Sequence, residues 1–140
     1  MKLGIIQCAK TKRLHPTTAV EMYWPSYSWR TGFQILTKLC DQVMILSDKY
    51  GLITPETIIK PYEADPRDLT REEIELVILS ALDFIDGDVD EVMVMWVPAA
   101  LRNFLQDSLP EGITFTNLFA GVSYTSAFLH LKTLKATHLK

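Results

Sequence analysis

Short apolar runs alternate along the chain with longer segments in which apolar residues recur every three or four positions. Four runs have the length and β-branched character of buried strands, at residues 3–7, 43–46, 91–97 and 113–118. Four segments have helical spacing, at residues 26–40, 70–87 and 98–108 and from Ser123 onwards. Strands that alternate with helices form βαβ units, whose crossovers place helices on both faces of a parallel sheet. The pattern predicts one α/β domain over residues 1–140, in three layers, with a mostly parallel central sheet of about four strands.

Signals for the ends of helices support this division. Thr70 with Glu73 has the pattern of a capping box, and Gly87 is expected to end the helix that follows. Ser123, which follows a turn at Gly121, is expected to cap the last helix.

Composition narrows the class of protein. A chain of 140 residues that is 48% hydrophobic and 22% charged is typical of one globular domain. No apolar run approaches the roughly 20 residues of a membrane helix, and the N-terminal run is too short for a signal peptide. We therefore expect a cytoplasmic protein with no membrane partner. Two cysteines form no disulfide framework, no Cys/His spacing indicates a metal site, and no cofactor is predicted.

Net charge bears on nucleic-acid binding. A charge of −3 does not favour wholesale wrapping of nucleic acid, which usually requires a basic surface. It leaves room for a local basic patch.

The stretch from Met44 to Glu63 has the strongest functional character. Its apolar start predicts a buried strand, and polar residues follow at once where that strand should end. Ligands of α/β sheets bind outside the carboxyl ends of the strands. The stretch therefore predicts a strand that delivers a polar loop into a site, and the loop residues with candidate chemistry are Ser47, Asp48, Lys49, Tyr50, Gly51, Tyr62 and Glu63.

A basic turn follows the first strand. Lys10, Thr11, Lys12 and Arg13 can offer cations and backbone N–H groups to a phosphate or carboxylate. The same composition also suits a solvated turn without a ligand. Cys8, just before the turn, is interpreted first as a small buried side chain and second as a thiol made acidic by the neighbouring lysines.

The polar loop also allows two interpretations. Asp48 could act as a general base or orient a sugar hydroxyl, but Asp also commonly bonds its own turn. Tyr62 could stack on a base, and Glu63 could supply a second carboxylate for acid–base chemistry. Alternatively, Pro55 and Pro61 brace a surface turn that binds nothing. Among the histidines, His15 could reach a ligand, whereas His130 and His138 are expected to be exposed.

A resemblance to a known family rests on several of these residues. The chain has Cys8-x-x-x-Lys12, Pro16, Met22-Tyr23, Ile45-Leu-Ser-x-Lys-Tyr-Gly-Leu52 and Ile59-x-Pro-Tyr62, with a glycine turn at Gly121 before the last helix. Over residues 5–132 it resembles a small, mostly uncharacterised domain family of bacteria, archaea and phages. That family is distantly similar to the catalytic core of archaeosine synthase, whose Pro-Cys-x-x-x-Lys-Pro-Tyr motif contains a functional lysine. Here Gln7 stands in place of the first proline and Arg13-Leu14 in place of Pro-Tyr.

A looser similarity links the family to the peroxide-stress protein YaaA, which binds DNA. Together the relatives imply work on nucleosides, modified bases or nucleic acid. The first hypothesis is an enzyme that acts on a nucleotide or nucleic-acid base, at the N-glycosidic bond or in base modification. The alternatives are a non-catalytic binder of nucleotide or nucleic acid and a phage or mobile-element interaction protein.

The enzyme hypothesis gives each residue a role. Catalytic roles are assigned to Lys12, Asp48 and Glu63, with Lys12 as an alternative nucleophile. Substrate binding is assigned to Cys8, Lys10, Thr11, Arg13, Tyr23, Ser47, Lys49, Tyr50, Gly51, Tyr62, Gly121 and Ser123. Because a base in duplex DNA must first be flipped out, a domain this small leaves room for a protein partner or a homo-oligomer.

Overall fold

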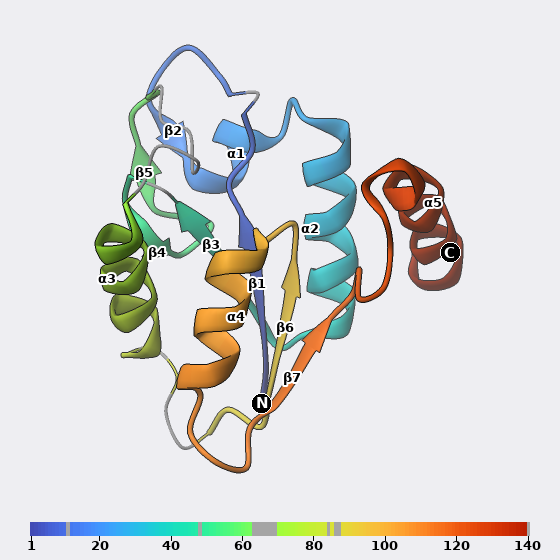
Figure 1. Cartoon of the computed structure of the whole chain (residues 1–140). Helices are drawn as coiled ribbons and strands as arrows, with labels where there is room; N and C mark the ends of the chain where they lie inside the picture. The colour runs from blue at the N-terminus through green and yellow to red at the C-terminus, as the bar shows by residue number, and fades with distance from the viewer. Residues whose placement is uncertain (11, 48, 63–69, 84, 86–87, 140) are drawn as a thin grey trace.

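A computed structural model describes residues 1–10, 12–47, 49–62, 70–83, 85 and 88–139. The protein is built on a five-stranded mixed sheet with strand order β4-β3-β1-β6-β7 (Figure 1). The strands are β1 (Lys2–Gln7), β3 (Gln42–Ser47), β4 (Gly51–Ile53), β6 (Glu91–Met95) and β7 (Thr114–Asn117). Four of them run parallel, and these are the four strands that the apolar runs predicted.

The fifth strand, β4, was not predicted. It pairs antiparallel with β3 at the sheet edge, with Ser47 opposite Gly51 and Ile45 opposite Ile53. Gly51 has φ +77°, a conformation that glycine adopts without strain and that suits the tight return. A separate two-stranded sheet joins β2 (Thr17–Thr18) to β5 (Ile58–Ile59). Both additions hold the segment 51–59 close to the polypeptide that follows β1.

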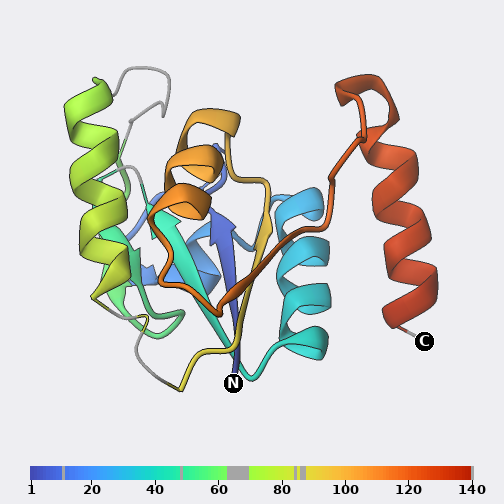
Figure 2. The same cartoon turned by 60° about the horizontal axis from the view of Figure 1, so that its bottom comes forward.

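Helices cover both faces of the main sheet. They are α1 (Ala19–Tyr23), α2 (Tyr27–Leu39), α3 (Arg71–Leu82), α4 (Ala99–Ser108) and α5 (Ala127–His138). Leu101 and Leu105 of α4 share a core with Ile5 of β1, whereas Ile35 and Leu36 of α2 belong to the core on the opposite face. Helix α5 packs against α2 and stands beyond it (Figure 2). No helix in the part of the chain that the structure describes has the length and apolar character needed to cross a membrane.

Two of the predicted helix starts can be checked against the caps. Thr70 Oγ1 accepts a bond from Glu73 N at 3.2 Å, so the cap at Thr70 is confirmed, and Glu73 Oε1 accepts from the Thr70 hydroxyl at 3.1 Å. The expected end of that helix at Gly87 is wrong, because α3 ends at Leu82 and neither Asp83 nor Ile85 is helical. The prediction for Ser123 is wrong, because a 3₁₀ turn at Tyr124–Ser126 precedes α5. Ser123 bonds Ser126 within that turn instead.

Close packing of α2 on β6 gives a first prediction. A Cβ added at Gly32 would lie 2.5 Å from Met95 Sδ and 2.7 Å from Trp96 Nε1. Alanine gains about 1 kcal/mol in helix propensity, but overpacking costs about 1–3 kcal/mol, and fully buried Met95 has no room to move. We expect Gly32→Ala to lower the free energy of unfolding by up to about 2 kcal/mol in urea denaturation. Gln34→Ala on the exposed side of α2 is the control, and equal stability of both variants would contradict this packing.

Candidate functional site

The segments that follow β1 and β3 leave the sheet side by side. Gln7 is in register with Leu46, and Cys8 N donates to Leu46 O at 2.9 Å. Both strands end at the upper edge of the sheet in Figure 1. The basic turn and the polar loop therefore start from the same place, as expected for neighbouring parallel strands.

Three hydroxyl groups meet at this edge and form what we call the hydroxyl cluster: Tyr23, Ser47 and Tyr62. The Tyr62 oxygen lies 2.5 Å from that of Tyr23 and 3.0 Å from Ser47 Oγ. Ser47 Oγ also accepts backbone N–H bonds from Lys49 at 3.2 Å and Tyr50 at 3.0 Å. Those two bonds occupy the acceptor positions of Ser47, so its hydroxyl donates to Tyr62, and one of the two phenols donates to the other in the Tyr23–Tyr62 bond.

The environment of Tyr62 keeps its phenol protonated. Burial is the main cause that raises its pKa far above the ordinary value, and the nearby Cys8 side chain acts in the same direction. The hydroxyl cluster is therefore a neutral network that fixes the loop after β3 to helix α1.

Two lysines and two tyrosines form the outer part of the site. Lys12 Nζ lies 4.6 Å from the centroid of the Tyr62 ring, and Lys49 Nζ lies 5.3 Å from that of Tyr50. The two rings meet edge to face at 5.6 Å, and the Tyr50 side chain is 36% exposed. Cations beside aromatic faces can bind the phosphate and the flat ring of one ligand. We call Lys12, Lys49, Tyr50, Tyr62 and Cys8 the carboxyl-edge site.

Gln7, the residue before Cys8, has a buried polar atom without a hydrogen-bond partner. Gln7 is 4% exposed, and its Nε2 donates to Cys8 Sγ at 3.5 Å. Within the described residues, Gln7 Oε1 is buried and accepts no hydrogen bond. An unsatisfied buried acceptor of this kind costs stability.

Several predicted site residues lie elsewhere. Arg13 Nε donates to Glu21 O at 3.2 Å, and Arg13 lines a separate groove of 610 Å³. Gly121 and Ser123 line a third groove of 380 Å³. They follow β7, and β6 lies between β7 and β1 in the sheet. The structure does not bring these three residues beside Tyr62: Arg13 N donates to Met22 O after Lys12, and Gly121 and Ser123 follow β7 at the far edge of the sheet. Their assignment to substrate binding stays a prediction.

The structure describes some of the remaining predicted site residues and not others. Lys10 is exposed, and its carbonyl accepts a bond from Lys12 Nζ at 3.4 Å. Gly51 supplies the turn into β4, and a Cβ added there would meet no atom within 4 Å. Thr11, Asp48 and Glu63 lie outside the described residues. The sequence pattern therefore predicted the core of the carboxyl-edge site but extended it too far.

One feature at the end of β6 was not predicted from the sequence. Trp96 has φ +63°, which is strained for a bulky side chain. Its ring lies 4.4 Å from that of Phe119, and its Nε1 donates to Ser28 O at 3.3 Å. Phe119 contacts His130, whose Nε2 lies 2.7 Å from Leu118 O. His130 is half-buried, and so is His138, so the prediction that both are exposed is wrong. The contacts of Phe119 and His130 attach α5 to the sheet.

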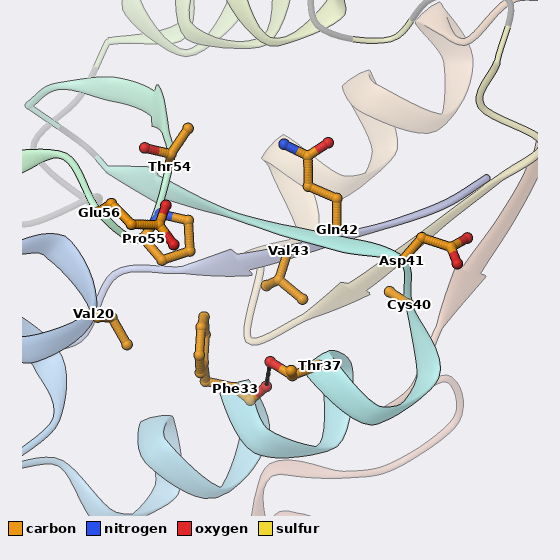
Figure 3. A pocket seen from close by; sticks show the side chains of 10 residues that line it. All are labelled: Val20, Phe33, Thr37, Cys40, Asp41, Gln42, Val43, Thr54, Pro55 and Glu56. Carbon is orange, nitrogen blue, oxygen red and sulfur yellow. Dashed lines mark hydrogen bonds between the residues drawn. The ribbon is translucent and has the colours of Figure 1, made fainter.

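A groove of about 520 Å³ on the flank of the molecule is distinct from the carboxyl-edge site (Figure 3). Phe33 and Thr37 of α2 line one side, and Val43 and Pro55 lie across from them. Cys40 lies at the same groove, and burial raises the pKa of its thiol to about 11. A thiol of that kind is a poor nucleophile at neutral pH.

Cys40 provides a pH-dependent prediction. Because its folded pKa of about 11 exceeds the ordinary value of 9.0, folding favours the protonated thiol. The corresponding stability is fully present below pH 9 and is lost as pH rises through 11. We expect Cys40 alkylation in the folded protein to keep accelerating up to about pH 11. In urea the rate should level off near pH 9, as peptide mass mapping would show, and identical profiles would refute the burial effect.

Removal of one oxygen from the hydroxyl cluster tests its structural role. Tyr62→Phe leaves the ring beside Lys12 but leaves the buried Ser47 and Tyr23 hydroxyls without this partner. We expect a loss of about 1–3 kcal/mol in unfolding free energy, the cost of an unsatisfied buried polar group. Tyr27→Phe, at a 44% exposed ring, is the matched control and should cost less than about 1 kcal/mol. Equal losses of unfolding free energy in Tyr62→Phe and Tyr27→Phe would contradict a stabilising role of the hydroxyl cluster.

Comparison with known proteins agrees with the expectation of an uncharacterised domain family. No curated protein and no solved structure matches the chain. A family of unknown function, DUF6884, matches residues 3–138, which is nearly the whole chain, and the chain therefore belongs to this family.

Proposed function

We propose that the carboxyl-edge site binds a nucleotide, free or within nucleic acid, and that the protein acts on its base or N-glycosidic bond. The observation that carries the proposal is the meeting of Lys12 and Lys49 with the rings of Tyr50 and Tyr62 at one end of the sheet. The resemblance to the archaeosine synthase core and to YaaA favours the same class of ligand.

Each part of a nucleotide has a complementary group at the site. The two ammonium groups suit a phosphate, and the exposed face of Tyr50 suits a base. A phosphate alone would need only the lysines, so the aromatic rings are what favour a complete nucleotide.

The proposed chemistry assigns proton transfer to the two loop carboxylates. Asp48 follows Ser47 directly in the chain, and Glu63 follows Tyr62. In hydrolysis, a water oxygen bonds to the sugar C1′ while the bond from C1′ to the base nitrogen breaks. One carboxylate takes the water proton, and the other carboxyl group gives a proton to the departing base. Lys12 Nζ is the alternative nucleophile, as the resemblance implies.

The test has a binding stage and a turnover stage. Mass spectrometry of the purified protein identifies any ligand that co-purifies, and a panel of nucleosides, nucleotides and oligonucleotides follows. We expect at least one member to raise the melting temperature, because a ligand that binds only the folded state stabilises it. If none does, neither catalytic nor non-catalytic nucleotide binding survives.

Turnover then separates an enzyme from a binding protein. Release of free base or formation of a modified base is followed by liquid chromatography with mass detection. The variants are Lys12→Ala, Asp48→Asn and Glu63→Gln, and the control is Lys38→Ala on the exposed end of α2. Loss of turnover in the site variants alone supports the enzyme. Binding without turnover by the intact protein would instead support the non-catalytic alternative.

A further inference from the structure

Charge is distributed very unevenly along this chain. Residues 1–40 contain six Lys or Arg and one acidic residue, Glu21, and residues 112–140 contain three Lys and no acidic residue. Residues 41–111 contain five Lys or Arg and sixteen Asp or Glu. The net charge of −3 therefore conceals two basic terminal parts and a strongly acidic middle.

The fold brings the two basic parts together. Helices α2 and α5, which come from the first and last parts of the chain, pack against each other on one side of the sheet (Figures 1 and 2). Neither helix contains an Asp or Glu, and together they carry Arg30, Lys38, Lys132 and Lys135. The acidic helix α3 packs on the opposite face of the sheet. One side of the molecule is therefore basic even though the whole protein is acidic.

Aromatic rings alternate with these cations over the surface of α1, α2 and α5. The Arg30 guanidinium lies 6.0 Å from the Trp24 ring and 5.7 Å from the Tyr27 ring. Lys135 Nζ donates to the Tyr27 hydroxyl at 3.1 Å. We call these residues, with Lys132 and Phe128, the basic–aromatic track.

The rings of the track are accessible. Tyr27 is 44% exposed, and Phe128 is 56% exposed beside Lys132 Nζ at 4.9 Å. The amine of Lys135 lowers the pKa of the Tyr27 phenol, which agrees with a local excess of positive charge. An exposed aromatic ring flanked by cations suits a ligand that has flat rings joined by negative groups.

The track continues toward the carboxyl-edge site. Trp24 and Arg13 line the same groove of 610 Å³, and Arg13 follows Lys12 in the chain. Glu21 also lines this groove, but its carboxylate accepts a hydrogen bond from Thr17 Oγ1 at 2.7 Å. Cations and rings thus extend from helix α5 to Arg13, the residue that follows Lys12.

We propose that the basic–aromatic track binds single-stranded nucleic acid and leads it to the carboxyl-edge site. The lysines and Arg30 contact phosphates, and Tyr27 and Phe128 stack on bases. Duplex binds less well, because paired bases present no free faces to the rings. The inference rests on the proposed function only in naming the carboxyl-edge site as the place where the track ends. The charges and aromatic rings of the track do not depend on that site.

Fluorescence anisotropy with labelled single-stranded DNA and RNA, and with a duplex of the same sequence, tests the track. The charge variant is Lys132→Gln with Lys135→Gln. The matched control is Lys2→Gln with Lys38→Gln, which removes the same charge outside the track, at the start of β1 and in the last turn of α2. Affinity is measured from about 50 to about 200 mM salt, because counterion release makes phosphate contacts visible as a salt dependence.

The expected results differ between cations and rings. The charge variant should lose about tenfold in affinity for single strands at low salt, and its log–log salt slope should become shallower by about 1.4, for two lost phosphate contacts. Tyr27→Leu should lose roughly tenfold with an unchanged slope, since stacking releases no counterions. The control should match the wild type in both quantities.

Other outcomes would overturn the track. These are equal losses in the charge variant and its control, duplex binding as tight as single-strand binding, or binding only to vesicles of phosphatidylserine and phosphatidylcholine. Stabilisation by free mononucleotides should be the same in the track variants and the wild type. If mononucleotides stabilise the protein but oligonucleotides bind no better, the track fails and the proposed function stands. If oligonucleotides bind through the track but are not turned over, and Lys12→Ala does not change their binding, the proposed function fails and the track stands.

Discussion

Replacing Lys12 with alanine is expected to reduce turnover of the nucleotide substrate by about 100-fold, the typical effect of removing one group that stabilises charge at a reaction centre. The side chain is half-buried and lies beside the Tyr62 ring, a contact that contributes only about 0.5–1 kcal/mol to stability. The melting temperature should therefore change little. The measurement is kcat/KM together with thermal unfolding of the same sample.

Two further variants make the Lys12 result interpretable. Lys12→Arg keeps the positive charge but cannot act as an amine nucleophile. It should therefore bind the ligand whether Lys12 acts as a charge or as a nucleophile. It should turn the ligand over only if Lys12 acts through its charge. Lys38→Ala removes a lysine on the exposed end of α2 and should behave as the wild type. Full activity of Lys12→Ala would exclude Lys12 from the reaction and from phosphate binding.

Trp29→Ala is expected to have the largest effect on stability. Trp29 is 2% exposed, its ring stacks on Phe33 at 5.2 Å and lies 5.4 Å from Tyr23, and its Nε1 donates to Gln7 O at 2.9 Å. Truncation of a buried Trp costs about 3–5 kcal/mol, a large part of the 5–15 kcal/mol that holds a typical domain. Urea denaturation should show this loss directly.

The hydrogen bond of Trp29 can be separated from its packing. Trp29→Phe keeps most of the apolar contact and removes the bond to Gln7 O, so it should cost the packing difference plus about 1 kcal/mol. Gln34→Ala on the exposed face of α2 should stay within about 0.5 kcal/mol of the wild type. A loss below about 1 kcal/mol for Trp29→Ala would contradict the packing of α2 on the end of β1.

The main sheet could be predicted from sequence because its parallel strands are buried on both faces. Such strands appear as continuous apolar runs, as in Val92 to Met95, and need no partner to be recognised. β4 escaped prediction because it has only three residues, and its pairing depends on the return at Gly51. The β2–β5 pair was not predicted because each of its strands has only two residues.

The candidate site was predictable only in its inner part. Neighbouring parallel strands bring the ends of β1 and β3 together whatever the loops do, so the proximity of Cys8 and Ser47 followed from topology. Tyr62 comes close to Lys12 only through the β4 return and the β2–β5 pair. The turn after Lys12 depends on the bond from Arg13 N to Met22 O, and α5 begins late because Ser123 closes a 3₁₀ turn. Neither is encoded in a local pattern. The pairing of basic α2 with basic α5 is likewise a tertiary property.

Binding of a nucleotide where the ends of β1 and β3 meet is the step on which the proposed function depends. It can be tested by titrating isotopically labelled protein with the nucleotide panel and recording two-dimensional amide NMR spectra. We expect the amide signals of Cys8, Lys12, Lys49, Tyr50 and Tyr62 to shift together with one dissociation constant, and Lys12→Ala to weaken this response. Shifts confined to the groove beside Cys40, or to that beside Ser123, would contradict binding at the carboxyl-edge site.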